Sequence, residues 1–223
     1  MDSPRERASA RDHVPGIVLA LAAGLHKMLL ASVLVNDDFM HRAYSRQLLA
    51  GEWPVRDFFD YGMVLMYAVS AAAQLVFGNR LFSEAVVIGV ATAVATFLVY
   101  DVARRATDST VVGAIAALML VVAAPRGYAY PKLLVYAVAA ALWWRYVWAP
   151  DRRKAIVLGL WAGIAFYWRP DHGAYVAAGV TLAMVAAHGF RLLTFVASAG
   201  VKLAREDPPG LYIAGIGAGL KIS

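Results

Sequence analysis

The sequence predicts an all-α polytopic membrane protein: a transmembrane helix bundle of about six spans, with a large outer loop of juxtamembrane helices after the first span. Of its 223 residues, 61% are hydrophobic and 16% charged, and a water-soluble domain of this length could not bury so much apolar surface. The net charge is +6, but the basic residues form short clusters between apolar runs. That distribution is typical of loops that orient a membrane protein, and it argues against a nucleic-acid-binding face. The chain has no cysteine, which excludes disulfides and thiolate metal sites.

The first span is predicted from Val14 to Val35. Arginines precede it, as in a signal peptide, but the run is too long and lacks a clean small-x-small cleavage site. We therefore expect an uncleaved helix, with residues 1–13 forming a basic cytoplasmic N-terminus. His26 and Lys27 lie near its middle, where a charge costs roughly 2.5–3.5 kcal/mol, so both are expected to face other helices or water.

A long polar interval, Asn36 to Gly62, follows the first span. Asn36 can cap a helix that Gly51 terminates, with Asp37 and Asp38 at the positive end of its dipole. One stripe of this helix consists of Met40, Ala43, Tyr44, Gln47 and Leu48, with Arg42, Ser45 and Arg46 largely opposite. We expect an amphipathic helix on the membrane surface.

The topology depends on Met63–Phe77, an apolar run of roughly 15 residues against the ~20 needed to cross a bilayer. The later apolar runs are Phe82–Val102, Thr110–Ala124, Leu133–Trp148, Ala155–Trp168 and Gly173–Ala187. If Met63–Phe77 does not cross, the basic clusters at 104–105 and 152–154 are cytoplasmic, in line with the positive-inside bias. We therefore expect a surface-lying or half-inserted helix there. Spans of about 15 residues then require tight hairpins or a locally thinned bilayer.

This topology places three polar, aromatic-rich loops on the same outer face: 36–62, 125–132 and 168–173. Polar loops that converge beside a membrane bundle indicate a site.

Several segments, in this order, resemble a known family. The stretch NDDFMHRAYSRQLLAGEWPVRDF (Asn36–Phe58) follows one basic-flanked helix and opens with paired acids, and it is similar to the start of the GT-C superfamily of membrane glycosyltransferases. The resemblance is closest to the dolichyl- or polyprenyl-phosphate-sugar-dependent mannosyltransferase and aminoarabinose-transferase-like branch. Phe77-Gly78, YPKLLVY (Tyr130–Tyr136) and GLWAGIAFYWRPD (Gly159–Asp171) extend it over roughly Val14 to Ala187.

The resemblance implies inverting transfer of a sugar from a polyprenyl-phosphate-sugar lipid donor to a glycan, lipid or protein acceptor on the outer face of a bacterial plasma membrane. It implies Asp37 as the general base, assisted by Asp38, because the acceptor hydroxyl must lose a proton as C1 gains oxocarbenium character. Cations must neutralise the departing phosphate. The predicted substrate-binding residues are Arg56, Asp57, Lys132, Arg169 and Asp171.

Each assignment has a structural alternative. Asp37 and Asp38 could serve only as N-terminal helix charges. Arg56 and Asp57 could form a local ion pair, Lys132 could anchor a headgroup, and Arg169–His172 could be a turn with an internal ion pair, in which His172 is a loop histidine. No cofactor is expected. Asp57-x-x-Asp60 is a weak signal for metal binding, so the sequence neither indicates nor excludes a bound divalent ion.

Three readings of the whole chain remain. The GT-C-like module is expected over residues 14–191, with its outer loop at 36–80, and residues 192–223 as a truncated or interfacial tail. Such enzymes usually continue through more helices, so this chain could be a fragment or need a partner subunit. The alternatives are a non-catalytic membrane subunit or pseudoenzyme, and a small transporter-like bundle with His26 and Lys27 on its pathway.

Overall fold

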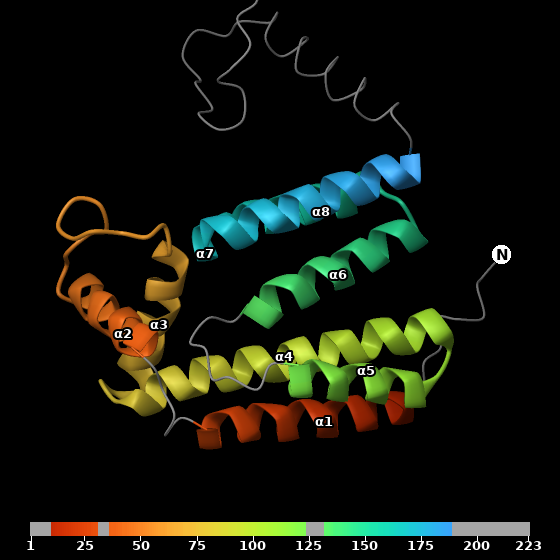
Figure 1. Ribbon diagram of the computed structural model, residues 1–223, viewed down its shortest axis with the longest axis horizontal. Helices are drawn as coiled ribbons and strands as arrows, with labels where there is room; N and C mark the ends of the chain where they lie inside the picture. The colour runs from red at the N-terminus through yellow and green to blue at the C-terminus, as the bar shows by residue number, and fades with distance from the viewer. Residues whose placement is uncertain (1–9, 31–35, 124–131, 189–223) are drawn as a thin grey trace, which may run out of the picture. The chain divides into compact units, whose positions relative to one another are not determined.

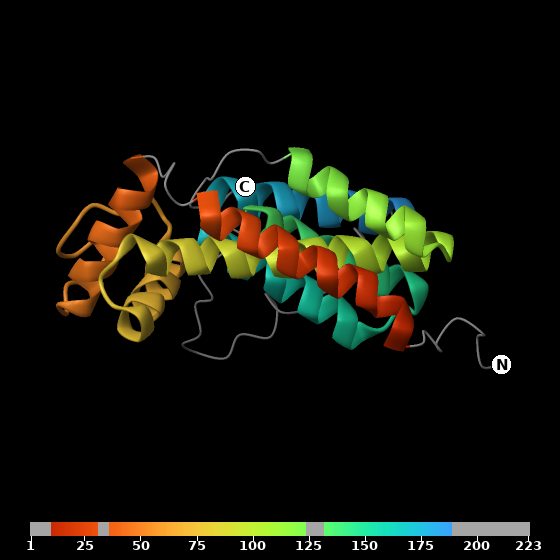
Figure 2. The same ribbon diagram turned by 90° about the horizontal axis from the view of Figure 1, so that it is seen from below.

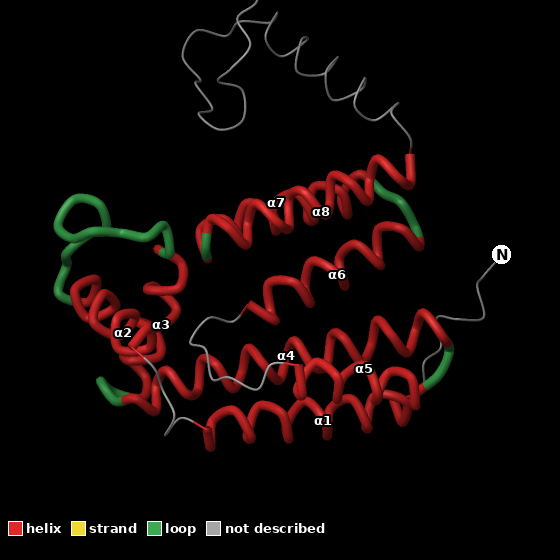
Figure 3. Tube along the Cα trace, in the orientation of Figure 1, coloured by secondary structure: helices red, strands yellow, loops and turns green. Residues whose placement is uncertain are grey.

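The computed structural model describes residues 10–30, 36–123 and 132–188, and within these ranges the fold is all-helical. Eight α-helices form this part of the chain (Figure 3), and one isolated β-bridge joins Pro54 and Phe58. The helices are α1 (Ala10–Leu29), α2 (Asn36–Leu49), α3 (Val64–Phe77), α4 (Leu81–Thr107), α5 (Thr110–Ala123), α6 (Lys132–Trp148), α7 (Arg152–Trp168) and α8 (Pro170–His188). The all-α prediction is confirmed for the described residues.

The chain divides into two compact units, Met1–Val180 and Thr181–Ser223. α8 begins in the first unit and ends in the second. The contacts that form the sites described below all lie within the first unit. The predicted module boundary at residue 191 and the predicted tail 192–223 lie outside the described residues.

α1 and α4 pack antiparallel through small residues. A Cβ on Gly24 would lie 2.8 Å from the carbonyl oxygen of Gly89, so the two backbones approach closely. Near the other ends of the two helices, Tyr100 Oη donates a hydrogen bond to the carbonyl oxygen of Asp12 at 2.5 Å. The start of α1 therefore lies beside the end of α4, and Figure 2 shows α1 running along α4.

The following helices reverse direction one after another (Figure 1). Gly113, near the start of α5, lies against Tyr100 and Arg104, near the end of α4. Trp161 Nε1 donates to the carbonyl oxygen of Val135 at 3.0 Å, which joins α7 to the start of α6. We call the end at which α4, α6 and α8 begin the loop end, and the end at which α5 and α7 begin the basic end.

One described helix, α4, is long and apolar enough to cross a membrane, with 27 residues. α3 and α5 are apolar but have 14 residues each. Membrane association is therefore supported by length and composition at α4, and the six predicted spans stay a prediction.

The predicted loop at 168–173 is wrong. α7 ends at Trp168 and α8 begins at Pro170, with only Arg169 between them, in an extended conformation (φ −166°, ψ 127°). Proline disfavours helical backbone in the residue before it, and its own fixed φ suits the first helical position. His172 consequently lies in the first turn of α8 and not in a loop.

α2 has the predicted bounds but a different partner. Its helix starts at Asn36, and Gly51 follows its end with φ +86°, a conformation that favours glycine. The partly buried Met40, Tyr44 and Leu48 pack against a cluster of Met63, Met66 and Tyr67. The apolar stripe therefore contacts α3 in place of the expected membrane surface.

Two positions of α2 differ from the predicted faces. Ala43, predicted on the apolar stripe, is exposed. Ser45, predicted largely opposite, is completely buried. Its hydroxyl donates to the carbonyl oxygen of His41 at 2.6 Å, which satisfies the polar group within the helix.

Candidate functional site

A polar cluster joins the first turns of α6 and α8 at the loop end. It consists of Lys132, Tyr136, Arg169, Asp171 and His172. Tyr136 Oη lies 2.5 Å from His172 Nδ1, and the two rings meet edge to face with centroids 5.4 Å apart. Three of the predicted substrate-binding residues, Lys132, Arg169 and Asp171, belong to this cluster.

Arg169 and Asp171 form the ion pair that one reading of the sequence anticipated. Arg169 Nε lies 2.9 Å from Asp171 Oδ1, and the same oxygen accepts the backbone N–H of His172 at 2.8 Å. Asp171 stands in the first turn of α8, where a carboxylate meets the positive end of the helix dipole. The ion pair is partly exposed, with side-chain exposures of 33% and 42%.

Burial and the neighbouring charges determine the protonation state of His172. Burial lowers the pKa of His172, and Arg169 and Lys132 lower it further against the opposing effect of Asp171. A neutral imidazole is therefore favoured near neutral pH, and its tautomer with the proton on Nε2 lets Nδ1 accept a hydrogen bond from the Tyr136 hydroxyl. His172 Nε2 is buried and has no hydrogen-bond partner in the described part of the chain.

The end of the polar interval 36–62 reaches this cluster. A Cβ on Gly62, which has φ +80°, would lie 2.6 Å from Cγ of Pro170. Trp168 packs against Met63, Met66 and Tyr67. Its indole Nε1 is, like His172 Nε2, buried without a hydrogen-bond partner among the described residues. The neighbourhood of the cluster therefore holds two buried polar atoms without a partner in the described part of the chain, which is uncommon in folded proteins.

Asp60 fixes the turn that brings this segment into place. Its Oδ1 accepts hydrogen bonds from the backbone N–H groups of Gly62 at 2.9 Å and Met63 at 3.1 Å, just before α3. A side chain that accepts hydrogen bonds from the backbone of a turn stabilises that turn. This structural role is sufficient to explain Asp60, which the sequence analysis considered as part of a weak metal-binding signal.

Arg56 and Asp57 form a separate local pair. Asp57 Oδ2 accepts Arg56 Nη2 at 2.6 Å and the backbone N–H of Trp53 at 2.7 Å. Arg56, with the backbone N–H of Trp53, lowers the pKa of the Asp57 carboxyl. This geometry agrees with the structural alternative stated above, in which Arg56 and Asp57 form a local ion pair on the surface. Val55 beside it has φ +71°, a strained conformation for a β-branched residue.

Asp37 and Asp38, the predicted base and its assistant, lie in the first turn of α2. Their side chains lie outside the described part of the structure, as does most of the predicted loop at 125–132. Their catalytic role stays a prediction.

The sequence reasoning missed a buried polar group between α3 and α4. The Ser70 hydroxyl donates to Glu84 Oε1, and Gln74 Nε2 donates to Ser70 Oγ at 3.3 Å. All three side chains are buried, as is His41 of α2. A lone glutamate within the apolar run 82–102, and a Ser-x-x-x-Gln spacing within 63–77, are the signals that could have revealed them.

Comparisons of the chain with protein-family models, with curated proteins and with solved structures found no match. The described residues hold no group of three or more His, Asp or Glu side chains that could bind a metal ion. The resemblance to GT-C enzymes therefore rests on the sequence segments alone.

Proposed function

We propose that this chain is an integral membrane glycosyltransferase of the GT-C type. It transfers a sugar from a polyprenyl-phosphate donor to an acceptor on the outer face of a bacterial plasma membrane. The observation that carries the proposal is the contact between the starts of α6 and α8, where Tyr136 Oη lies 2.5 Å from His172 Nδ1. This contact brings together two helix starts that carry cations far apart in the sequence: Lys132 begins α6, and Arg169, which pairs with Asp171, directly precedes α8. The end of the polar interval 36–62 packs beside them through Gly62 and Pro170.

Such a cluster suits the leaving group of the reaction. The acceptor oxygen attacks C1 of the sugar from one side, the bond from C1 to the phosphate oxygen breaks, and the electron pair stays on the polyprenyl phosphate. Lys132 and Arg169 would stabilise the phosphate charge, and Asp37 would take the acceptor's proton. The Tyr136 to His172 hydrogen bond holds the first turns of α6 and α8 together around that position.

The helix directions support the proposed six-span topology. Since α1 and α4 are antiparallel, the chain leaves α1 and enters α4 at the same end, and α2 and α3 pack together between them. That arrangement agrees with α3 as a helix that does not cross. The basic residues Arg104, Arg105, Arg152, Arg153 and Lys154 all belong to the basic end, in line with a cytoplasmic location. α5, at about 1.5 Å per residue, is shorter than a ~30 Å hydrocarbon core and requires local thinning.

The test is transfer of radiolabelled sugar from a mixed pool of polyprenyl-phosphate sugars in membranes that express this chain. Asp37→Asn is expected to lower the rate by roughly 100-fold or more, as loss of a general base does. Asp151→Asn, at an exposed carboxylate before α7, is the matched control and should leave transfer unchanged. Full transfer by Asp37→Asn would contradict the base assignment. No transfer by folded, inserted wild-type chain would favour a non-catalytic subunit, or a chain that needs a partner.

The transporter alternative depends on the ionisable residues His26 and Lys27 of α1, and the side chain of Lys27 is buried, as expected. His26 lines a cavity of about 210 Å³ between α1, α4 and α5. Its other lining residues are apolar apart from Thr96, whereas an ion pathway requires a succession of polar groups. The glycosyltransferase proposal therefore has the better support.

A further inference from the structure

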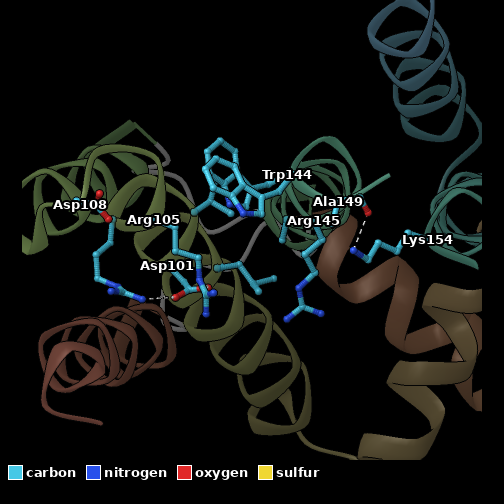
Figure 4. Close-up of a pocket in the computed structure, with 12 residues that line it drawn as sticks. Asp101, Arg105, Asp108, Trp144, Arg145, Ala149 and Lys154 are labelled. Atoms are coloured by element: carbon cyan, nitrogen blue, oxygen red, sulfur yellow. Dashed lines mark hydrogen bonds and ion pairs between the residues drawn. The ribbon is translucent and has the colours of Figure 1, made fainter. Parts of the chain in front are cut away.

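A second cavity lies at the basic end, away from the polar cluster. It has a volume of about 290 Å³ and is lined by the last turns of α4 and α6 and the first turn of α7 (Figure 4). Its charged lining residues are Arg104, Arg105, Arg145, Lys154, Asp101 and Asp108. Four basic groups thus face two carboxylates, and the cavity carries an excess of positive charge.

Asp101 neutralises only part of that charge, because it serves several partners at once. Its Oδ1 lies 3.3 Å from Arg104 Nη2 and its Oδ2 lies 2.7 Å from Arg105 Nε. His13 Nδ1 approaches the same carboxylate at 3.7 Å. One carboxylate between two guanidinium groups leaves a net positive charge, and this charge attracts an anion.

Arg104 provides a buried cation in the cavity wall. The residue is only 9% exposed, and its Nε is buried with no hydrogen-bond partner among the described residues. A buried charge that is incompletely compensated is costly. The negative charge of a phosphate in the cavity would lower that cost.

Arg145 and Lys154 line the same cavity. Arg145 is exposed, and its guanidinium makes no interaction drawn in Figure 4. Lys154 Nζ donates to the carbonyl oxygen of Ala149 at 2.7 Å, and Ala149 also lines the cavity. Both cations can contact an anion in the cavity.

The rest of the lining suits a lipid. Trp144, which lines the cavity, stacks on Trp148 with ring centroids 5.7 Å apart, and tryptophan favours the headgroup level of a bilayer. Leu98, Val102 and Ala141 add an apolar wall. A cavity lined by cations and by an apolar wall fits a headgroup phosphate with the glycerol and acyl chains that follow it.

We propose that this cavity binds the headgroup phosphate of an anionic phospholipid in the leaflet at the basic end. The proposal depends on the membrane location of the chain and not on sugar transfer. A binding measurement can therefore succeed where the transfer assay fails.

The experiment measures binding of phosphatidylglycerol to the purified full-length chain in detergent, by native mass spectrometry. Phosphatidylcholine and inorganic phosphate are the two comparison ligands. The double variant Arg145→Gln with Lys154→Gln removes two cations that line the cavity, of which Arg145 is exposed and Lys154 is half-buried. Arg152→Gln with Arg153→Gln removes the same charge from exposed positions nearby that do not line the cavity.

We expect phosphatidylglycerol to bind better than phosphatidylcholine, and the first double variant to weaken its binding by about thirty-fold, at roughly five-fold per cation. The control variant should bind as the wild type does. Equal weakening in both variants would mean non-specific surface charge and would overturn the proposal. Displacement of the lipid by an equal concentration of inorganic phosphate would assign the cavity to a free anion and overturn it as well.

Discussion

Tyr136 Oη lies 2.5 Å from His172 Nδ1, and this contact joins the first turns of two helices that are separated by all of α7. Since burial lowers the pKa of His172, the imidazole is an acceptor for the phenol hydroxyl near neutral pH. Protonation of Nδ1 would remove that acceptor. Protonation would therefore reverse this hydrogen bond, with Nδ1–H donating to Tyr136 Oη.

The stability of the fold should fall as the pH drops below about 6.5. An unfolded chain protonates His172 near pH 6.5, whereas the folded chain does so only at a lower pH because its pKa is lowered. Between the two values the unfolded state binds more protons, so stability is complete above the window and declines through it by at most roughly 1.4 kcal/mol per pH unit. His172→Gln should reduce the decline in thermal unfolding midpoint between pH 7.5 and pH 5.5. An equal decline in wild type and variant would refute the assignment.

Loss of Glu84 should destabilise the packing of α3 on α4. Glu84→Ala leaves the buried Ser70 hydroxyl without its acceptor, at a cost of about 1–3 kcal/mol. Glu84→Gln keeps an acceptor oxygen and should cost less. The thermal unfolding midpoint in detergent measures both, with Glu52→Ala in the loop after α2 as a control expected within about 0.5 kcal/mol of wild type. If alanine and glutamine were equally mild, the hydrogen bond would have no role in stability.

The close approach of α1 and α4 should not tolerate a side chain. Gly24→Ala would place its methyl group 2.8 Å from the backbone oxygen of Gly89, and backbone cannot move aside as a side-chain tip can. Overpacking of this kind costs about 1–3 kcal/mol. Gly159→Ala in α7 meets no atom within 4 Å and should be neutral or stabilising by up to about 1 kcal/mol. The two midpoints, measured side by side, test whether the α1 contact is as tight as described; similar values would show that it is not.

The sequence predicted the helices well because apolar runs and their breakers are local signals. Local signals were insufficient at Pro170. A proline next to charged residues predicts a loop, but α8 begins at this proline, whose fixed φ suits the first position of a helix. α4 likewise continues past Val102, where the apolar run ends, and Asp101 pairs with Arg104 and Arg105 there at helical spacings of three and four residues.

Three predicted substrate-binding residues, Lys132, Arg169 and Asp171, belong to the polar cluster, and their role stays a prediction. They were chosen through the family resemblance, whereas the pairing of Tyr136 with His172 spans 36 residues and no spacing rule reveals it. The stripe of α2 was recognised, whereas its partner was not, since a period of 3.6 residues shows an apolar face without showing what covers it. Ser45 was predicted on the polar face of α2 because it is a polar residue. Its hydroxyl donates a hydrogen bond within its own helix, so the side chain can be buried.

Single cysteines should locate the two ends of the bundle, because the native chain has none. Ala50 follows α2 and Ala106 lies in the last turn of α4, and both are exposed. The proposed topology predicts that an impermeant thiol reagent labels Ala50→Cys in intact cells, and Ala106→Cys only after permeabilisation. Ser45→Cys should resist the reagent in both states, since Ser45 is buried. Labelling of Ala106→Cys in intact cells would reverse the topology.

Arg169 should affect the lipid donor more than the acceptor if it stabilises the departing phosphate. Arg169→Gln removes the charge while keeping a hydrogen-bonding side chain, and the loss of a charge-assisted hydrogen bond of about 1.5–3 kcal/mol corresponds to roughly 10- to 150-fold in kcat/KM for the donor. Arg169→Lys should recover part of that loss, because an ammonium keeps the charge but not the planar guanidinium fork. Since Arg169 also pairs with Asp171, the variant Asp171→Asn separates the two roles: it breaks the ion pair and keeps the cation. Donor kinetics close to wild type in Asp171→Asn, together with a loss in Arg169→Gln, would assign the guanidinium to the phosphate. Equal losses in the two variants would assign it to the structure of the first turn of α8.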